Sequence, residues 1–419
     1  MVAFATPHIV IIGAGFGGLQ TAVSLGGAAA RVTLIDRHNY HTFVPLLYQV
    51  ATATLEPEWI ALPIRKLLRR FANLQFLQGA VKAVDYTAQQ VHLAQTTLTY
   101  DYLVLATGSQ THYQGVPGAK EHAFPLRTLE DAIALKHHLL RCIERATQTS
   151  DPDQRRQLLT ITLVGGGATG VEMAGALVEL CHQAWPQDYP WLKQDPVRLI
   201  LVQSGAEFLP EFPHSLRTYT YKKLTKLGLD IQAKTKVAAV HPTHVQLETG
   251  IHLPCATTIW TAGVQAVLPQ AQPPLPQAER GKIPVLSSLQ LQPYPNVYAL
   301  GDAAQVRGQS LAGVAPEALQ QGVCTARNLR RQLQGRHPQP FRYFNKGRLA
   351  IIGCCSGVGK IGPFPIRGWL GWFLWLAVHL IYVPGYRNRC FILLTWLQSF
   401  SNRDKLAQQL LKRGSTTDS

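Results

Sequence analysis

The sequence HIVIIGAGFGGLQTAVSLGGAAARVTLID, at residues 8–36, decides the fold because it predicts a strand, a glycine turn, a helix and a second strand in that order. The turn fits G-x-G-x-x-G at Gly13, Gly15 and Gly18. These glycines permit a tight turn, a close approach of backbone amides to a pyrophosphate, and close packing of helix on strand. Asp36 ends the second strand, where a carboxylate is placed to accept hydrogen bonds from ribose hydroxyls. The positive end of the helix favours phosphate. We therefore predict a dinucleotide site, with an ordinary glycine turn as the alternative.

The same pattern recurs in the middle of the chain. An apolar strand is expected at residues 158–164, followed by a G-x-G-x-x-G turn at Gly165, Gly167 and Gly170 and a helix over residues 171–180. Two such repeats in one chain predict two dinucleotide sites and an α/β fold with two Rossmann-like domains.

The second strand of this repeat, at residues 197–202, is followed by Gln203 where the first repeat has an acid. A carboxylate repels the 2′-phosphate of NADPH, whereas a neutral amide donates to that phosphate or accepts from a hydroxyl. No arginine follows at once to bind a phosphate. We expect a relaxed preference between NADH and NADPH. A preference for NADH held by other contacts is the alternative.

Three further apolar segments end on glycine turns, where backbone groups can approach a cofactor closely. They are residues 101–109 (DYLVLATGS), 257–263 (TTIWTAG) and 296–304 (NVYALGDAA). Asp302, in the last of them, is a candidate to bind a ribityl hydroxyl or to face a helix N-terminus beside phosphates. A plain turn is the alternative for this segment.

The composition limits the classes of partner. The chain of 419 residues is long enough for two or three domains, and 40 Lys and Arg against 24 Asp and Glu suit an anionic partner such as a phosphorylated cofactor or an acidic lipid surface. The basic residues are scattered and form no recognisable nucleic-acid-binding module, so nucleic acid is discounted. The N-terminus leaves little room for a signal peptide, and we expect the reducing cytoplasmic side.

The seven cysteines form no C-x-x-C, which argues against a thioredoxin-like redox pair and against a zinc site. Cys354 and Cys355 are adjacent and suggest a redox role, yet vicinal cysteines do not readily form a relaxed disulfide. All seven are expected to be small buried hydrophobic residues.

The segments between the motifs are assigned from local patterns. Residues 37–53 are expected to be a loop lining the flavin or substrate cleft, with a core-packed connection as the alternative. The remaining assignments are a basic helix at 63–71, an antiparallel β-excursion at 74–100, a helix at 129–145, a polar linker at 147–156 and a proline-rich loop at 272–276.

The C-terminal residues 368–400 contain two aromatic and apolar runs, each shorter than the roughly 20 residues needed to cross a bilayer. Apolar side chains recur there at helical spacing, namely Trp369, Trp372, Phe373, Leu376, Leu380 and Val383. Cations border them, namely Arg367, Arg387, Arg389, Arg403 and Lys405. We predict two helices that lie in the membrane interface. Burial in a dimer interface or against the flavin domain is the alternative.

Together these motifs resemble the two-dinucleotide-binding-domain flavoproteins, and within them the type II NADH:quinone oxidoreductases. The resemblance covers nearly the whole chain and is carried by DRHNYHTFVPLLYQVATA (36–53), GGGATGVEMAG (165–175), WTAGV (260–264), the segment 298–304 and the C-terminal half. It implies an FAD-binding domain at 1–112 and 266–340, an NAD(P)H-binding domain at 113–265, and a C-terminal membrane-anchoring region at 341–419.

The resemblance also implies site residues. FAD would be held by Gly13, Gly15, Gly18, Asp36, Thr107, Gly108 and Asp302, and the nicotinamide nucleotide by Gly165, Gly167, Gly170 and Gln203. Arg37, Ala106, Gly301 and Gly263 are further expected cofactor contacts, and no metal site is expected. Glu172, at the family's helix-opening glutamate, is expected near the nicotinamide and the flavin; attraction of an acid to the helix dipole is its alternative explanation.

This sequence departs from the family pattern at the motif that the family carries beside the quinone. The family carries A-Q-x-A-x-Q, but this chain has Ala315-Pro316-Glu317-Ala318-Leu319-Gln320, so Gln320 is kept and Pro316 replaces the first glutamine. Gln320 would act alone, or Glu317 or another group would compensate. Lys346 matches a lysine at the quinone entrance, with an exposed turn lysine as the alternative.

The implied reaction passes a hydride from NADH or NADPH to FAD and then two electrons to a membrane quinone, without proton pumping. The chain would be a peripheral membrane protein on the cytoplasmic face, and a homodimer. Three alternatives remain: a sulfide:quinone oxidoreductase that uses Cys324, Cys354 or Cys355, a soluble ferredoxin or disulfide reductase, and a nucleotide-binding redox sensor without turnover. The intact second glycine motif argues against the sulfide enzyme, which needs no nicotinamide site. A soluble ferredoxin or disulfide reductase would lack the apolar C-terminal region.

Overall fold

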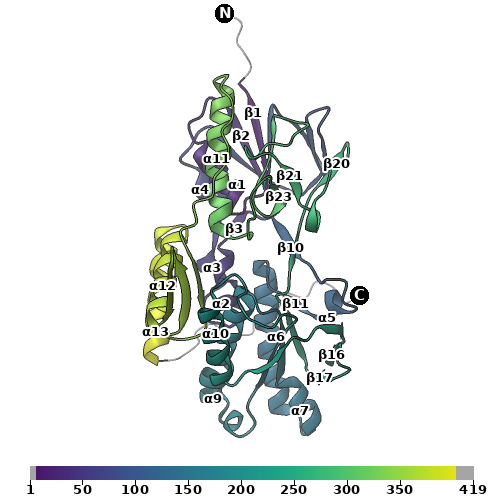
Figure 1. Cartoon of the computed structure of the whole chain (residues 1–419), viewed down its shortest axis with the longest axis vertical. Coiled ribbons are helices and arrows are strands. Elements are labelled where there is room, and N and C mark those ends of the chain that lie inside the picture. The colour runs from purple at the N-terminus through teal and green to yellow at the C-terminus, as the bar shows by residue number, and fades with distance from the viewer. Residues whose placement is uncertain (1–5, 403–419) are drawn as a thin grey trace, which may run out of the picture. The chain divides into compact units, whose positions relative to one another are not determined.

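The computed structural model describes residues 6–402, which form two compact units (Figure 1). Unit 1 comprises residues up to 42, 62–110 and 264–344. Unit 2 comprises residues 43–61, 111–263 and 345–402. The C-terminal region expected at 341–419 is thus grouped, through residue 402, almost entirely with unit 2. Arg403 and Lys405, which were expected to border the C-terminal helices, lie outside the described residues.

Unit 1 is built on a parallel five-stranded sheet of order β22-β9-β1-β2-β5. Its strands are β1 (His8–Ile12), β2 (Arg31–Asp36), β5 (Leu74–Gln78), β9 (Tyr102–Leu105) and β22 (Val297–Ala299). Two helices, α1 (Phe16–Ser24) and α11 (Ala315–Leu333), pack side by side in this unit (Figure 1). The close packing depends on glycine, because a Cβ on Gly322 of α11 would lie 2.5 Å from the carbonyl oxygen of Gly17.

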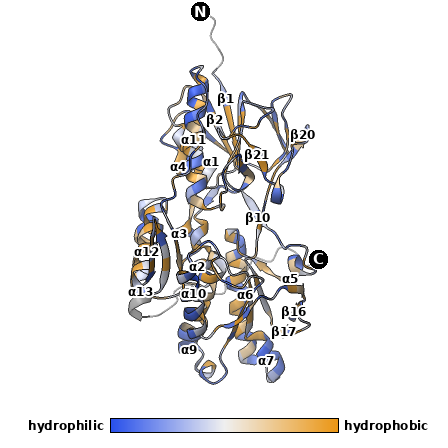
Figure 2. Cartoon of the chain, viewed as in Figure 1, coloured by the Kyte–Doolittle hydropathy of each residue, from blue (hydrophilic) through white to orange (hydrophobic). Residues whose placement is uncertain are grey.

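The strand register of unit 1 brings the predicted binding turns to one edge of the sheet. Ile12, the last residue of β1, is paired with Ile35 of β2 on one side and with Leu105 of β9 on the other. Since all three strands are parallel, the segments that follow them emerge at the same edge. The buried residues of β1 and β2 are mostly hydrophobic (Figure 2), namely Ile9, Val10, Ile11, Ile12, Val32, Leu34 and Ile35.

A second small sheet of unit 1 is antiparallel over β6 (Val81–Asp85), β7 (Gln90–Leu93) and β8 (Thr97–Thr99), and β20 (Gln270–Gln272) adds to it parallel to β6. Strands β21 (Ile283–Val285) and β23 (Ala304–Val306) pair separately. The expected antiparallel excursion at 74–100 is therefore wrong at its beginning. Leu74–Gln78 is a strand of the parallel sheet, because the apolar residues Leu74 and Phe76 are buried in the main core of the unit.

Unit 2 repeats the architecture with a sheet of order β11-β18-β12-β13-β14. Its strands are β11 (Phe124–Pro125), β12 (Thr160–Val164), β13 (Arg198–Gln203), β14 (Asp230–Ala233) and β18 (Thr257–Trp260), and its longer helices are α6 (Leu129–Gln148), α7 (Pro152–Leu158), α8 (Ala168–Glu179) and α10 (His214–Lys226). Val164 is paired with Val202 and with Trp260, so the segments after these three strands again share one edge. The expected α/β fold with two parallel, Rossmann-like sheets is confirmed.

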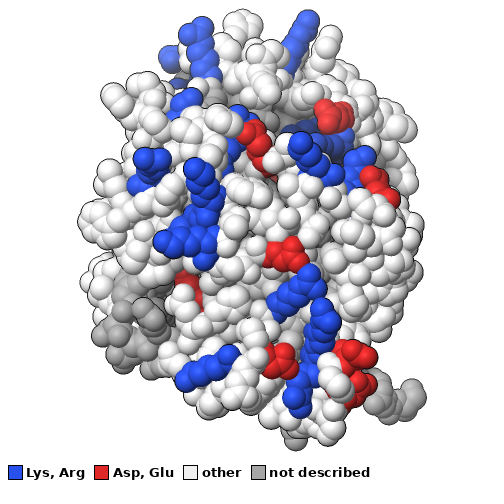
Figure 3. All heavy atoms as spheres, turned by 60° about the horizontal axis from the view of Figure 1, so that its bottom comes forward, with Lys and Arg blue, Asp and Glu red and all other residues white. Residues whose placement is uncertain are grey.

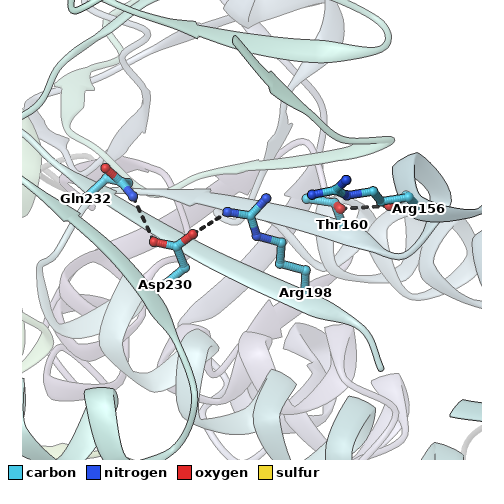
Figure 4. A network of polar contacts seen from close by, with 5 residues as sticks. All are labelled: Arg156, Thr160, Arg198, Asp230 and Gln232. Atoms are coloured by element: carbon cyan, nitrogen blue, oxygen red, sulfur yellow. Dashed lines mark hydrogen bonds and ion pairs between the residues drawn. The ribbon is translucent and has the colours of Figure 1, made fainter. Parts of the chain in front are cut away.

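The opposite edge of this sheet, where the strands begin, is held by polar contacts (Figure 4). Arg198 of β13 pairs with Asp230 of β14, and Gln232 also donates to Asp230. The hydroxyl of Thr160, the first residue of β12, donates to the carbonyl of Arg156 in α7. The polar linker expected at 147–156 is in part wrong, because Asp151 caps a helix there through the backbone N–H groups of Asp153 and Gln154.

The C-terminal part of unit 2 is an antiparallel sheet with two helices, and α12 packs against all three strands of this sheet. The elements are β24 (Arg348–Ile351), β25 (Gly357–Ile361), β26 (Phe364–Gly368), α12 (Trp369–Tyr382) and α13 (Tyr386–Asn402). Three more strands of unit 2 form a separate antiparallel sheet: β15 (Val237–Val240), β16 (His244–Leu247) and β17 (His252–Pro254). The remaining short elements are β3 (Tyr40–Thr42), β4 (Ala61–Pro63), β10 (Ser109–Thr111), β19 (Val264–Ala266), α2 (Leu47–Ala51), α3 (Pro57–Ile60), α4 (Ile64–Leu68), α5 (Ala119–His122) and α9 (Trp185–Asp188).

Three further expectations need correction. Within the expected loop at 37–53, residues 47–51 form the helix α2, whose side chains are all buried, so this part is a core-packed connection. The apolar series from Trp369 to Val383 is not one exposed face, because Trp372 in α12 and Val383 just after it are buried whereas Trp369 and Phe373 are exposed. The cysteines are also not all buried, since Cys354 and Cys355 are exposed and Cys324 and Cys390 are half-buried.

Candidate functional site

In the glycine turn of unit 1, two of the three motif glycines pack against backbone atoms and the third faces open space. Gly13 has φ +102°, and a Cβ there would lie 2.3 Å from the carbonyl oxygen of Ala106. A Cβ on Gly18 would lie 1.9 Å from the carbonyl oxygen of Gly13, because helix and strand meet there. At Gly15 a Cβ would meet no atom within 4 Å. The turn thus needs glycine at two positions for its own packing and leaves the third facing open space, which fits a pyrophosphate.

The glycine turn of unit 2 has similar geometry, with Gly165, Gly167 and Gly170 in the places of Gly13, Gly15 and Gly18. Gly165 has φ +115°, and a Cβ on Gly170 would again lie 1.9 Å from a carbonyl oxygen, that of Gly165. Gly167, like Gly15, has nothing within 4 Å of a built Cβ. Each turn precedes the N-terminus of a helix, α1 in unit 1 and α8 in unit 2, where unpaired backbone N–H groups favour phosphate.

The last residue of each second strand, β2 or β13, holds the adjacent glycine turn in place. In unit 1 the carboxylate of Asp36 accepts the backbone N–H of Ala14 at 2.7 Å, and in unit 2 the side-chain oxygen of Gln203 accepts the backbone N–H of Gly166 at 2.9 Å. The Gln203 amide also donates to the carbonyl of Glu207 at 3.4 Å. Gln203 therefore replaces the acid as an acceptor without bringing its negative charge.

The other turns of unit 1 lie beside its glycine turn. Ala106 donates its N–H to Ile12, and the hydroxyl of Thr107 donates to the carbonyl of Val267. Gly108 follows with φ +70°. Arg37, next to Asp36, is exposed. The structure therefore brings the residues predicted after β1, β2 and β9 to one edge of one sheet.

Asp302 is held by the same region of unit 1. The hydroxyl of Ser109 donates to the Asp302 carboxylate at 2.6 Å, and the N–H of Gly301 donates to the side chain of Gln321 in α11 at 2.5 Å. In unit 2, Gly263 has φ +96° and its carbonyl accepts the N–H of His112 at 3.1 Å. The hydroxyl of Ser109 thus orients the Asp302 carboxylate, and its role in binding a cofactor stays a prediction.

Glu172 of α8 is a buried carboxyl group. Its oxygen accepts the indole N–H of Trp375 in α12 at 2.9 Å and lies 3.4 Å from the backbone nitrogen of Ile351 in β24. Burial raises the pKa of Glu172 to about 8, although both hydrogen bonds act to lower it. Glu172 is the fifth residue of its helix and does not lie in the first turn, so the helix dipole does not explain it. A carboxyl group with this pKa can hold or release a proton near neutral pH.

Buried aromatic and polar groups surround Glu172. His379 stacks on the Trp375 ring at 3.8 Å between ring centroids, and burial lowers the pKa of His379 to about 4. The indole of Trp396 in α13 donates to Gln49 at 2.8 Å, and Gln49 donates to the hydroxyl of Tyr48 at 2.9 Å. Burial raises the pKa of Tyr48, and the charge of Glu172 raises it further. Sequence reasoning missed Trp375, Tyr48, Gln49 and Trp396 as partners of this site.

The residues expected near the quinone make structural contacts. The amide of Gln320 both donates to and accepts from the backbone of Phe344, at 2.9 and 3.0 Å. Glu317 is buried and accepts the N–H groups of residues 312–314, and Pro316 occupies the first turn of α11, where its missing N–H costs nothing. Glu317 therefore orders the loop before α11, and its carboxylate already accepts three backbone N–H groups.

Lys346 and α12 lie near an exposed apolar surface of unit 2. The ammonium of Lys346 is 3.4 Å from the hydroxyl of Tyr382, the last residue of α12. The apolar surface, hereafter the α12–α13 surface, consists of Trp369, Leu370, Phe373, Ile381, Tyr382, Tyr386, Phe391, Leu393, Leu394 and Leu397, all of them exposed. Within residues 6–402 no helix has the length and apolarity to cross a membrane.

On the face shown in Figure 3, Lys and Arg are scattered in several groups, with fewer Asp and Glu among them, and form no single band. The exclusion of nucleic acid as a partner stays a prediction.

The geometry defines a protein with two dinucleotide-binding folds, and comparison with known proteins agrees with it. The pyridine nucleotide-disulphide oxidoreductase family matches residues 7–322. Type II NADH:quinone oxidoreductase Ndh of Mycobacterium tuberculosis is 36% identical over 94% of this chain and 88% of its own length. Demethylphylloquinone reductase NdbB of Synechocystis is 30% identical over 94% of this chain and 96% of its own length.

A solved structure shares the fold at low sequence identity. NDH2 from Plasmodium falciparum, in complex with NADH, superposes with a TM-score of 0.89 at 18% identity, covering 95% of this chain and 99% of that chain. The chain therefore belongs to the pyridine nucleotide-disulphide oxidoreductase family of enzymes. Within that family it is a member of the type II NADH:quinone oxidoreductases, as the sequence resemblance implied.

Proposed function

We propose that this enzyme is an FAD-dependent NAD(P)H:quinone oxidoreductase, with FAD on unit 1 and the nicotinamide nucleotide on unit 2. The observation that carries the proposal is the pair of matching glycine turns, each with one glycine facing open space. The identity of 36% with a type II NADH:quinone oxidoreductase over 94% of the chain supports the reaction class. The roles of the individual site residues below belong to the same proposal.

On unit 1, the residues fit a flavin dinucleotide by their chemistry. Gly15 leaves the pyrophosphate path open, Asp36 offers a carboxylate to ribose hydroxyls, and Asp302 offers a second carboxylate. When bound, FAD supplies the chemistry that accepts a hydride from a reduced nicotinamide and returns two electrons to a quinone. The protein itself contributes binding, orientation and the movement of protons.

On unit 2, Gly167 leaves room for the nicotinamide pyrophosphate, and Gln203 faces the ribose position with a neutral amide. NADH is the expected donor. NADPH is expected to be tolerated more than with an acid at this position, because no negative charge opposes its 2′-phosphate.

Glu172 is proposed to hold a proton at its carboxyl oxygen and to release it during turnover, since its pKa of about 8 lies close to neutral pH. Trp375 orients that oxygen through its indole N–H. Gln320 would position the backbone of Phe344 beside a quinone path, and Lys346 would present a cation near the edge of the α12–α13 surface.

The α12–α13 surface is proposed to bind the cytoplasmic face of a membrane, which gives access to a membrane quinone. Exposed tryptophan and phenylalanine rings with Arg387 and Arg389 at the border suit an interfacial location, and the net charge of +16 favours acidic lipids. Homodimer formation and the lack of proton pumping belong to this proposal. Sedimentation velocity in detergent and a pH-sensitive dye inside proteoliposomes test these two points.

A steady-state assay tests the reaction. Full-length enzyme supplied with FAD should oxidise NADH only when a quinone such as a short-chain ubiquinone or menadione is present, and sulfide should not replace NADH. Turnover with sulfide and not with NADH would move the chain to the sulfide:quinone class. FAD binding without turnover by any donor would favour the redox sensor.

Vesicle flotation tests the membrane contact. The triple variant Trp369→Ser/Phe373→Ser/Ile381→Ser should lose binding to anionic vesicles, since each buried apolar side chain contributes about 1.5–3 kcal/mol. It should keep its activity with a water-soluble quinone. Ile251→Ser, at another exposed apolar position of unit 2, is the matched control and should bind as the wild type. Equal binding by the triple variant would contradict this assignment.

A further inference from the structure

The proposed function assigns no role to the adjacent thiols of Cys354 and Cys355. They lie in the tight turn between β24 and β25, at residues 352–356. Both are exposed, although the residues on either side of them are buried. Their sulfur atoms are 3.2 Å apart. The pair therefore presents two thiols to solvent at a short and defined separation.

The turn that carries the thiols is held from several sides. The N–H of Ile352 donates to the carbonyl of Ser356 at 2.7 Å, and the hydroxyls of Ser356 and Tyr219 are 3.0 Å apart. The turn also packs on α8, because a Cβ on Gly175 would lie 2.5 Å from the backbone nitrogen of Gly353. Cys355 has a left-handed backbone, with φ +57°. The backbone that carries the two thiols is thus held before any ligand binds, which lowers the entropic cost of binding.

The sulfur separation distinguishes between possible uses of the pair. A disulfide needs sulfurs about 2.0 Å apart and Cα atoms usually more than about 4.4 Å apart, whereas adjacent Cα atoms across a trans peptide are about 3.8 Å apart. A tetrahedral zinc ion with Zn–S bonds of about 2.3 Å holds two sulfurs about 3.8 Å apart. A pyramidal three-coordinate ion with bonds of about that length and angles near 90° holds them about 3.3 Å apart. The observed separation of 3.2 Å lies nearer to the last geometry than to the other two.

The pair supplies two soft sulfur ligands, which suits an ion that brings its own third ligand. A trivalent organoarsenical brings its own carbon as the third ligand and takes two soft thiolate ligands from the protein.

We propose that Cys354 and Cys355 form a dithiol site that chelates trivalent arsenicals. In the reaction with an arsine oxide, each thiol gives up its proton, two As–S bonds form and the oxide oxygen leaves as water. The oxidation state of arsenic does not change, so no oxidant or reductant is needed.

Phenylarsine oxide is the probe for this site. The full-length enzyme, reduced with a phosphine and freed of excess reductant, is mixed with the probe and its intact mass is measured. One phenylarsenic group should replace two thiol hydrogens. The label should survive excess 2-mercaptoethanol and be removed by 2,3-dimercaptopropanol, because only a dithiol competes with a chelate.

Single-cysteine variants separate chelation from simple thiol modification. Cys354→Ser and Cys355→Ser should each lose the label that survives the monothiol, whereas Cys390→Ser and Cys324→Ser, the matched controls at half-buried cysteines, should keep it. Thermal unfolding of each variant establishes that it is folded. Removal of the wild-type label by 2-mercaptoethanol, or its retention in both Cys354→Ser and Cys355→Ser, would overturn the proposal. A Cys354–Cys355 disulfide that persists after reduction would overturn it as well.

Discussion

The carboxyl group of Glu172 and the indole of Trp375 form a buried hydrogen bond of 2.9 Å between residues 203 positions apart in the chain. Glu172 comes from the helix that follows the second glycine turn, and Trp375 comes from the C-terminal helix α12, part of which forms the α12–α13 surface. This bond joins, within unit 2, the proposed nucleotide-binding element to the proposed membrane-binding element. It also involves a buried ionisable group, whose protonation affects the stability of the fold.

The raised pKa of Glu172 predicts a pH-dependent stability. Because the folded-state pKa of about 8 lies above the value of 4.5 of the free side chain, the folded state holds a proton that the unfolded state has lost in this pH range. The contribution of this group is therefore fully favourable below about pH 4.5 and is lost as the pH rises through about 8. Glu172→Gln should be more stable than the wild type at pH 8, by at most about 5 kcal/mol.

Thermal unfolding of the two proteins from pH 4.5 to pH 9 measures this difference. The other ionisable groups near the site, His379, Tyr48 and Glu179, are present in both proteins, so their effects largely cancel in the comparison. Parallel stability curves across the whole range would show that Glu172 ionises normally.

Trp375→Phe removes the donor to Glu172 and should destabilise the enzyme by about 1–3 kcal/mol, because a buried acceptor loses its partner. Trp396→Phe is the matched control, since Trp396 is also buried and donates to the neutral Gln49. Both variants should be less stable than the wild type. Only Trp375→Phe should move the pH midpoint of Glu172 upward, because the Trp375 hydrogen bond lowers that pKa. Equal midpoints in both variants would mean that Trp375 only fills space.

The two glycines Gly167 and Gly170 should respond differently to the same substitution. Gly170→Ala places a methyl group against the carbonyl of Gly165 and should cost about 1–3 kcal/mol of stability. Gly167→Ala meets no protein atom within 4 Å and should change stability by less than about 0.5 kcal/mol. It should still raise the KM for NADH about tenfold or more, because lost hydrogen bonds to a charged phosphate cost about 1.5–3 kcal/mol. An unchanged KM in a folded Gly167→Ala enzyme would place the pyrophosphate elsewhere.

Gln203→Glu keeps an oxygen to accept the N–H of Gly166 and adds a negative charge. Two unit charges about 4 Å apart repel by about 1–4 kcal/mol between bulk water and the protein surface. We therefore expect kcat/KM for NADPH to fall about tenfold or more, with that for NADH within about twofold. Asp36→Asn, at the corresponding position of unit 1, should leave the ratio of the two donors unchanged. A ratio that Gln203→Glu does not alter would assign donor choice to other contacts.

The sequence predicts those features of the fold that depend on local pattern. The strand His8–Ile12 and both glycine turns were predicted because a β-branched run and fixed glycine spacing are themselves the physical requirement. Helix α6 was predicted from its periodicity, and the structure adds a capping box between Thr128 and Asp131. These elements need no knowledge of distant contacts.

The remaining features depend on contacts between distant residues. From local pattern alone, Leu74–Gln78 is predicted to belong to a small antiparallel β-excursion. Its parallel pairing with Arg31–Asp36 is a contact between distant residues that only the structure shows. The exposed position of Cys354 and Cys355 follows from a turn packed on Gly175, which no local pattern indicates. The same holds for Trp375 beside Glu172. The roles of Gln320 and Lys346 stay predictions, since their observed partners are Phe344 and Tyr382.

The central claim is that a nicotinamide reduces a flavin held by this chain and that a quinone reoxidises it. Anaerobic stopped-flow measurement of flavin absorbance, with NADH, NADPH and sulfide mixed in separately and a short-chain quinone added afterwards, tests this claim most directly. We predict rapid bleaching by NADH, bleaching by NADPH at a rate that reports on Gln203, and recovery of the absorbance with quinone. Bleaching by sulfide alone, with no response to either nicotinamide, would contradict the account.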